Sequence, residues 1–234
     1  MLLPLPLVAA DISFDPSITQ EQFRTFSALV AQGIHPTPVE PATARGLFSF
    51  DIGLAGTAIP IDEDAEYWVR AVDSDFTTNG YVIVPRVVVS KGLGVANIAA
   101  SYAKIPDTDI AVLGGTLDVP VIRGGLVWPT LAVRGSYADL RGVDEFDLRT
   151  YGAEAFLSKA FGPVTPYAAA GIMRTRAIGI IEEQGPIPRT ELRDEFDQER
   201  YTLGLRFSLV VIRFAVEATQ AEERSYAAKV SFGL

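Results

Sequence analysis

Residues 226–234 read YAAKVSFGL, and apolar side chains alternate through them with small or polar ones. The apolar set is Tyr226, Ala228, Val230, Phe232 and Leu234. A period of two puts alternate residues on opposite faces of a β-strand, so this stretch predicts a strand with one apolar face. Residues 48–55, FSFDIGLA, alternate in the same way. The region from residue 44 to residue 234 therefore begins and ends with a strand.

The sequence between these two runs keeps the period of two and is interrupted by clusters of Gly, Pro and Asp, which is typical of an antiparallel all-β domain. Further strands are expected at about 81–90, 95–102, 109–121, 129–138, 148–158, 166–176, 201–209 and 214–219. Most of them reach the length of about 9 to 11 residues with which a tilted strand crosses a bilayer. We expect about ten strands in all.

The connections between these strands fall into two classes. Short ones lie at 91–94, 122–128, 159–165 and 210–213, and the alternate ones lie at 59–80, 103–108, 139–147, 177–200 and 220–225. The alternate set includes two long, acid-rich segments. A transmembrane up-and-down barrel sorts its connections in this way, with short periplasmic turns, longer outer loops and both chain ends in the periplasm. A soluble β-sandwich, the alternative fold, gives no reason for such sorting.

Charged residues give a second test of the membrane barrel, because a charged side chain facing lipid at the bilayer centre costs about 2–4 kcal/mol. Counted by alternation, most charged strand residues fall opposite the apolar face. The predicted lumen charges are Asp51, Arg86, Asp118, Arg134, Glu154, Arg174, Arg206, Glu217 and Lys229. Bases and acids nearly balance in this set, which suits a polar lumen better than the dry core of a sandwich. We expect a structural ion-pair network rather than an acid–base catalytic pair.

The N-terminal part of the chain has a different character. Residues 1–10, MLLPLPLVAA, are similar to the apolar part of a secretory signal peptide without its basic flank, and a plain strand or loop is the alternative. Residues 15–32 have helical spacing and are followed by three prolines before residue 43. We therefore divide residues 11–43 from the barrel as a helix and linker. The apolar residues of this helix either plug the periplasmic mouth of the barrel or dock beneath it: Phe23, Phe26, Leu29 and Val30.

The composition excludes several kinds of function. The chain has no cysteine and one histidine, His35, so it can build neither a thiolate site nor a multi-histidine metal site. A net charge of -9 opposes binding to the phosphate backbone of nucleic acid. No spaced set of oxygen ligands predicts a metal site, and no loop has the context of a nucleotide-binding motif. We expect no enzyme activity and no cofactor.

The last strand, YAAKVSFGL, resembles the C-terminal signature of bacterial outer-membrane β-barrel proteins, with Leu234 where phenylalanine is usual. Residues 87–94 (VVVSKGLG), 164–172 (VTPYAAAGI) and 201–208 (YTLGLRFS) resemble strands of porin-like and fatty-acid-transporter-like barrels. The resemblance implies that the barrel-assembly machinery reads the final strand. The residues that would form this assembly signal are Tyr226, Val230, Phe232 and Leu234. In the transporter-like family an N-terminal segment plugs the lumen.

Two functions follow from the sequence. The first is passive transport or binding of small, apolar molecules across the bacterial outer membrane, with the N-terminal segment as a gate. The second is a structural or surface-interaction barrel whose lumen is filled and carries no transport, because a barrel of about 8 strands is just filled by its own side chains. In both cases we expect the outer face of the barrel to contact the lipid of the outer membrane.

Overall fold

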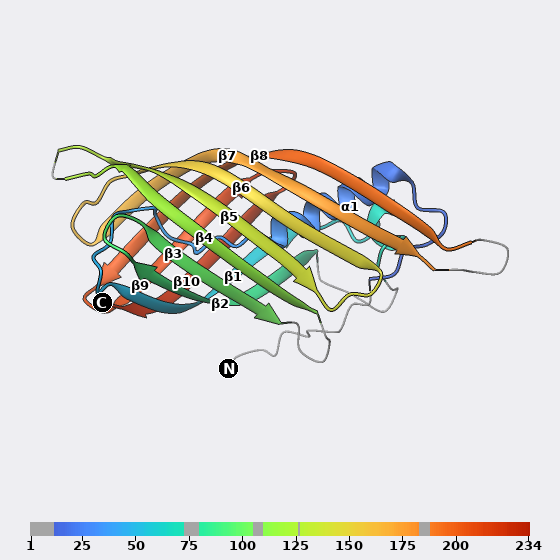
Figure 1. Ribbon diagram of the computed structural model, residues 1–234, viewed down its shortest axis with the longest axis horizontal. Coiled ribbons are helices and arrows are strands. Elements are labelled where there is room, and N and C mark those ends of the chain that lie inside the picture. The colour runs from blue at the N-terminus through green and yellow to red at the C-terminus, as the bar shows by residue number, and fades with distance from the viewer. Residues whose placement is uncertain (1–11, 73–79, 105–109, 126, 183–187) are drawn as a thin grey trace.

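The computed structural model describes residues 12–72, 80–104, 110–125, 127–182 and 188–234. Ten antiparallel strands follow one another around a closed barrel (Figure 1). The strands are β1 (Phe50–Pro60), β2 (Tyr81–Gly92), β3 (Asn97–Lys104), β4 (Ala111–Ile122), β5 (Thr130–Arg141), β6 (Phe146–Ser158), β7 (Val164–Ile181), β8 (Thr190–Leu209), β9 (Ile212–Gln220) and β10 (Arg224–Gly233). The predicted all-β barrel with a short N-terminal helix is confirmed.

The final strand closes the barrel against the first. β10 pairs with β1 from Asp51 opposite Gly233 to Ala58 opposite Tyr226. Beyond this ladder, the backbone groups of Phe50 and Leu234 bond to each other. Closure gives every strand a hydrogen-bonded neighbour on both sides, which is the condition for strands to lie in lipid.

The two ends of the barrel differ. At one end, here called the turn end, the turns 93–96, 159–163 and 210–211 lie beside the C-terminal end of β10. At the opposite end, here called the loop end, lie the connections 142–145 and 221–223 and the short helix α2 (Glu66–Val69). Within the described ranges, neither helix of the protein has the length and apolar character needed to cross a bilayer.

Strands β7 and β8 are much longer than the alternation predicted. The residues expected to form the long connection 177–200 belong largely to this hairpin, which extends past its neighbours at the loop end (Figure 1). Its outer face there carries cross-strand ion pairs, with Arg174 Nε 2.8 Å from Asp197 Oδ1 and Arg176 Nε 3.0 Å from Glu195 Oε2. Charged residues stand on the outer face of this part of the hairpin, because a strand outside the lipid needs no apolar outer face. The alternation of apolar and polar residues that would have predicted a strand is therefore missing here.

The outer face of the barrel carries a continuous apolar band. Exposed apolar residues lie along the middle of the strands: Leu54, Val87, Ile98, Leu117, Val133, Ile172, Leu205, Val216 and Val230. Outward-facing tyrosines border the band toward the loop end: Tyr81, Tyr102, Tyr137, Tyr151, Tyr201 and Tyr226. Exposed aromatic residues toward the turn end include Phe48, Phe50, Trp128, Phe161, Phe207, Phe214 and Phe232. An apolar band between two aromatic girdles is the outer surface of a barrel that spans a membrane.

The N-terminal helix α1 (Gln20–Ile34) lies inside the barrel at the loop end (Figure 1). It starts later than the predicted residue 15 because Thr19 caps it. The Thr19 hydroxyl accepts a hydrogen bond from the Gln22 backbone nitrogen, and the Gln22 side chain accepts one from the Thr19 nitrogen, a capping box. The helix ends at Ile34, two residues before Pro36.

The direction of the N-terminal segment, defined here as residues 12–49, corrects the sequence prediction. We expected the helix, and the segment that leads into it, at the mouth formed by the short turns. Instead Ile12 bridges to Val72 at the loop end, whereas Leu234 lies at the turn end. An extended chain rises about 3.1 Å per residue, so the residues between α1 and β1 suffice to cross a membrane barrel about 25 Å tall.

Candidate functional site: the filled lumen

The loop half of the lumen is apolar and aromatic. Phe23 and Phe26 of α1 are fully buried, and their rings lie within 6.1 Å of the ring of Phe146 on the barrel wall. Phe14 packs edge-to-face on both α1 rings. Trp68 of α2 closes the cluster from the β1–β2 connection. The helix therefore fills this mouth with a core of the kind found inside soluble domains.

Hydrogen bonds at the surface fix the start of the segment to the β1–β2 connection. The backbone nitrogen of Asp15 donates to the Arg70 carbonyl oxygen at 2.9 Å. The Ser17 hydroxyl and backbone nitrogen both donate to the Asp15 carboxylate, and these bonds hold the pKa of Asp15 below its usual value. The Gln22 amide donates to Glu66 Oε2 at 2.5 Å. The mouth is thus closed by two segments far apart in sequence.

Below α1, the linker passes a layer of buried charge. Arg86 of β2 donates to the carbonyl oxygens of Gly33 and His35, the residues where the helix ends. His35 Nε2 lies 3.5 Å from Glu154 Oε2, and Arg200 Nε lies 3.6 Å from the other oxygen of that carboxylate. The last carbonyls of a helix need donors, and here the barrel wall supplies them.

A second arginine holds the middle of the linker. Arg134 of β5 donates to both carboxylate oxygens of Asp118 on β4, at 2.6 and 2.9 Å, and to the Glu40 carbonyl oxygen at 3.0 Å. Its guanidinium also lies 4.2 Å from the ring centroid of Phe156. Opposite, Glu217 accepts hydrogen bonds from the hydroxyls of Thr37 and Tyr167, at 2.8 and 2.7 Å. The linker is therefore bonded to several strands.

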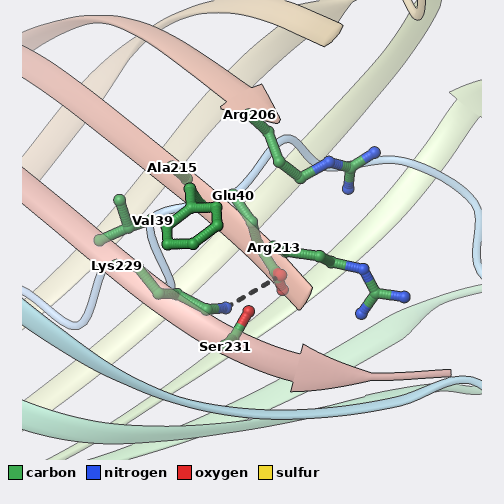
Figure 2. Close-up of a pocket in the computed structure, with 8 residues that line it drawn as sticks. Val39, Glu40, Arg206, Arg213, Ala215, Lys229 and Ser231 are labelled. Atoms are coloured by element: carbon green, nitrogen blue, oxygen red, sulfur yellow. Dashed lines mark hydrogen bonds and ion pairs between the residues drawn. The ribbon is translucent and has the colours of Figure 1, made fainter. Parts of the chain in front are cut away.

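The turn half of the lumen holds a compact ion-pair network, of which Figure 2 shows the contact between Lys229 and Glu40. Lys229 Nζ lies 3.2 Å from Glu40 Oε2 and 3.0 Å from Asp51 Oδ1. Arg213 Nη1 donates to Asp51 Oδ2 at 2.6 Å, and Arg45 Nη1 lies 3.3 Å from Glu40 Oε1. Two of these residues, Glu40 and Arg45, belong to the linker. The same network joins the segment to β1, β9 and β10.

Small residues of the wall make room for the segment. A side chain at Gly114 would place its Cβ 2.3 Å from Pro36, and one at Gly179 would place it 2.5 Å from the ring of Phe23. Only glycine allows the linker and helix to approach the strands this closely. Two of the pockets in the described lumen hold about 160 and 170 Å³ of space, with open solvent included.

The structure places the sequence-selected charges mostly inside the barrel. Those that face the lumen are Asp51, Arg86, Asp118, Arg134, Glu154, Arg206, Glu217 and Lys229. Arg174 is the exception, because Met173 and Thr175 fill the inner face of β7 and leave Arg174 outside against Asp197. The sequence prediction assumed that this part of β7 crosses the lipid, where a charged side chain would have to face the lumen. The β7–β8 hairpin instead carries charged side chains on its outer face at this position.

The other selected residues have clear positions. Phe23, Phe26 and Leu29 are buried in the lumen mouth, and Val30 packs against the same cluster. Tyr226, Val230, Phe232 and Leu234 all point outward from the last strand and the residue that follows it. Residues 1–10, which resemble a signal peptide, lie outside the described residues.

Alternation missed the lumen residues that do not sit on the expected strands: His35, Glu40, Arg45, Arg200 and Arg213. The charges of the linker, Glu40 and Arg45, were a signal, because a charged segment tethered to a barrel mouth needs opposite charges nearby. Within the described ranges, no group of His, Asp or Glu side chains is arranged to hold a metal ion.

No protein-family model and no curated protein sequence matches the chain. Among solved structures it is similar to the N-terminal β-barrel domain of Pseudomonas aeruginosa OprF, with a TM-score of 0.35 and 10% identity, over 81% of this chain and 100% of that one. It is also similar to Neisserial surface protein A (TM-score 0.32, 12% identity, 79% of this chain, 96% of that one). A third similar structure is that of Ail, the attachment invasion locus protein of Yersinia pestis (TM-score 0.33, 13% identity, 79% of this chain, 93% of that one). The chain's own closed barrel and apolar outer band are those of a transmembrane β-barrel.

Proposed function

We propose that the protein is a structural or surface-interaction barrel of the outer membrane, closed along its lumen by its own N-terminal segment. One observation carries this proposal: the barrel wall binds the backbone of the segment, through Arg86 at the end of α1 and Arg134 at Glu40. These bonds, together with the ion pairs of Glu40 and Arg45, would hold the segment in place and close the lumen.

The orientation proposed places the loop end at the cell surface and the turn end in the periplasm. Short turns face the periplasm and longer connections face outward in barrels of this kind. The charged outer face of the β7–β8 hairpin, beyond the tyrosine girdle, would then stand clear of the lipid and meet partners outside the cell. Leu234 would lie on the periplasmic side, where the barrel-assembly machinery would read the outward face of Tyr226, Val230 and Phe232.

A second candidate function is passive uptake or binding of small apolar molecules, with the segment as a gate. The apolar lining of the loop half favours it, because displacing α1 would uncover an apolar bowl formed by wall residues. The residues that line this bowl are Leu140, Phe146, Leu148, Met173 and Ala177. The polar turn half would stay occupied by the linker.

Single-channel conductance in planar bilayers distinguishes these functions. The full chain is expected to remain at background conductance. A variant lacking residues 12–43 is expected to conduct, because removing the linker leaves open space beside the wall glycines Gly114 and Gly152. Both proteins must first show the heat-dependent gel shift of a folded barrel. A synthetic peptide of residues 12–43, added to the deletion variant, should lower its conductance again.

Two other results would change the account. Conductance of the full chain equal to that of the deletion variant would contradict a closed lumen. Background conductance together with accelerated entry of an apolar solute into vesicles containing the full chain would favour the gated transporter over the structural barrel.

A further inference from the structure

A half-open pocket lies where the lumen meets the turn end. It holds about 160 Å³ of space, its open side included, between β8, β9, β10 and the linker. Its polar lining consists of Glu40, Arg206, Arg213, Lys229 and Ser231, which are labelled in Figure 2, and Val39, Phe214 and Ala215 complete the lining. This pocket is separate from the apolar cluster at the loop end.

Positive charge exceeds negative charge around this pocket. Four cationic side chains, those of Arg45, Arg206, Arg213 and Lys229, share two carboxylates, Glu40 and Asp51. Both carboxylates are already engaged with the other three cations. The local balance of these side chains is therefore about +2, on a chain whose net charge is -9.

Arg206 is the cation that the network does not use. Within the described residues, no carboxylate oxygen lies within the 4.0 Å of an ion pair from its guanidinium, and its one hydrogen bond runs from Nη2 to the Thr165 hydroxyl at 3.4 Å. Its Nε is buried without a partner. A buried guanidinium nitrogen without an acceptor is unfavourable, so the site favours an acceptor brought by a ligand.

Arg206 and Arg213 are placed to act together. Arg206 pairs in register with Ala215, and Arg213 lies two residues farther along β9 toward the turn end. Figure 2 shows both guanidinium groups extending to the same side, away from the contact between Glu40 and Lys229. Each guanidinium group offers a planar set of N–H donors, which is the kind of donor that phosphate oxygens accept from.

The surface around the pocket would attract anions. The turns 93–96, 123–129, 159–163 and 210–211 contain Arg123 and Lys159 but no aspartate or glutamate, whereas acidic residues crowd the connections of the loop end. An anion approaching the turn end therefore meets a positive local field despite the negative net charge of the chain.

We propose that Arg206 and Arg213 bind a phosphate group at the mouth of this pocket. The group belongs either to free phosphate in the surrounding solution or to the headgroup of a phospholipid in the adjacent leaflet, since both offer the same oxyanion. This inference does not depend on whether the lumen transports solutes.

Titration calorimetry with inorganic phosphate tests the site, using the full chain refolded in a maltoside detergent that contains no phosphate. Arg206→Gln is expected to weaken binding by about tenfold or more, because it removes charge-assisted hydrogen bonds. Arg206→Lys, which keeps the charge without the planar fork, should weaken binding less. Arg193→Gln, a surface change at the loop end, should leave binding unchanged.

Folding is checked for each variant by its heat-dependent gel shift. Phosphate should also raise the unfolding temperature of the unmodified chain and raise that of Arg206→Lys by less, so the test does not rest on Arg206→Gln alone. Absence of phosphate binding to the unmodified chain would overturn the proposal, as would equal binding by folded Arg206→Gln.

Nanodiscs separate the two sources of phosphate. If the site takes a lipid headgroup, phosphatidylglycerol nanodiscs should suppress the binding of inorganic phosphate, and nanodiscs of a galactolipid without phosphate should not. If the site takes free phosphate, binding should be equal in the two lipids. Either result supports the phosphate site and identifies where the bound phosphate group comes from.

Discussion

Replacing Asp118 by leucine is expected to lower the free energy of unfolding by about 3–5 kcal/mol, the usual cost of leaving one partner of a buried ion pair alone. Asp118 and Arg134 are both buried and joined by two short hydrogen bonds. Without the carboxylate, the close partners left to the Arg134 guanidinium among the described residues would be the Glu40 carbonyl oxygen and the ring of Phe156. Urea unfolding in lipid vesicles, followed by tryptophan fluorescence, measures the change.

Two further variants show whether the loss comes from the unpaired charge. The double variant Asp118→Leu, Arg134→Met should recover much of the stability, because apolar replacement of a whole buried pair is often close to neutral. Arg174→Gln, which breaks a pair on the outer face of β7, should leave the unfolding free energy almost unchanged, because water screens that pair. Equal losses for Asp118→Leu and Arg174→Gln would contradict the buried network.

Placing arginine at Val216 is expected to cost about 2–4 kcal/mol and to reduce insertion into vesicles strongly, because Val216 lies at the middle of β9 on the lipid face. Gln220→Arg is a matched control on the same face of the same strand, at its loop end, where the cost falls to about 0–1 kcal/mol. The fraction of each variant that becomes resistant to protease in vesicles is the measurement. Equal insertion of the two variants would contradict the position of the apolar band.

Alternation allowed the barrel wall to be predicted from the sequence because a strand has only two faces. Once Leu117 or Val216 is assigned to lipid, Asp118 and Glu217 must face inward, and the structure places both there. Alternation failed at Arg174, where the strand continues past the lipid and charge on the outer face costs little. Alternation with a period of two residues shows which face of a strand is apolar, but it does not show where along the strand the membrane ends.

The path of the N-terminal segment could not be predicted for a different reason. Spacing gave a helix with Phe23 and Phe26 on one face, and the prolines gave an extended linker. Neither the helical spacing nor the prolines indicate at which end of the barrel the segment begins. The direction depends on contacts far apart in sequence, such as Arg86 with His35 and Lys229 with Glu40. Small inward residues of the wall accommodate the linker, as Gly114 does beside Pro36.

The threading of this segment through the whole lumen can be tested most directly by labelling single cysteines, because the chain has no cysteine of its own. Glu21→Cys lies on the exposed side of α1 at the loop end, and Gly46→Cys lies at the turn end, where an added Cβ meets no neighbour. In intact cells of a Gram-negative host, a maleimide that cannot cross membranes should label Glu21→Cys. It should label Gly46→Cys only after the outer membrane is permeabilised. Labelling of both positions from the same side of the membrane would contradict a segment that runs from one mouth of the barrel to the other.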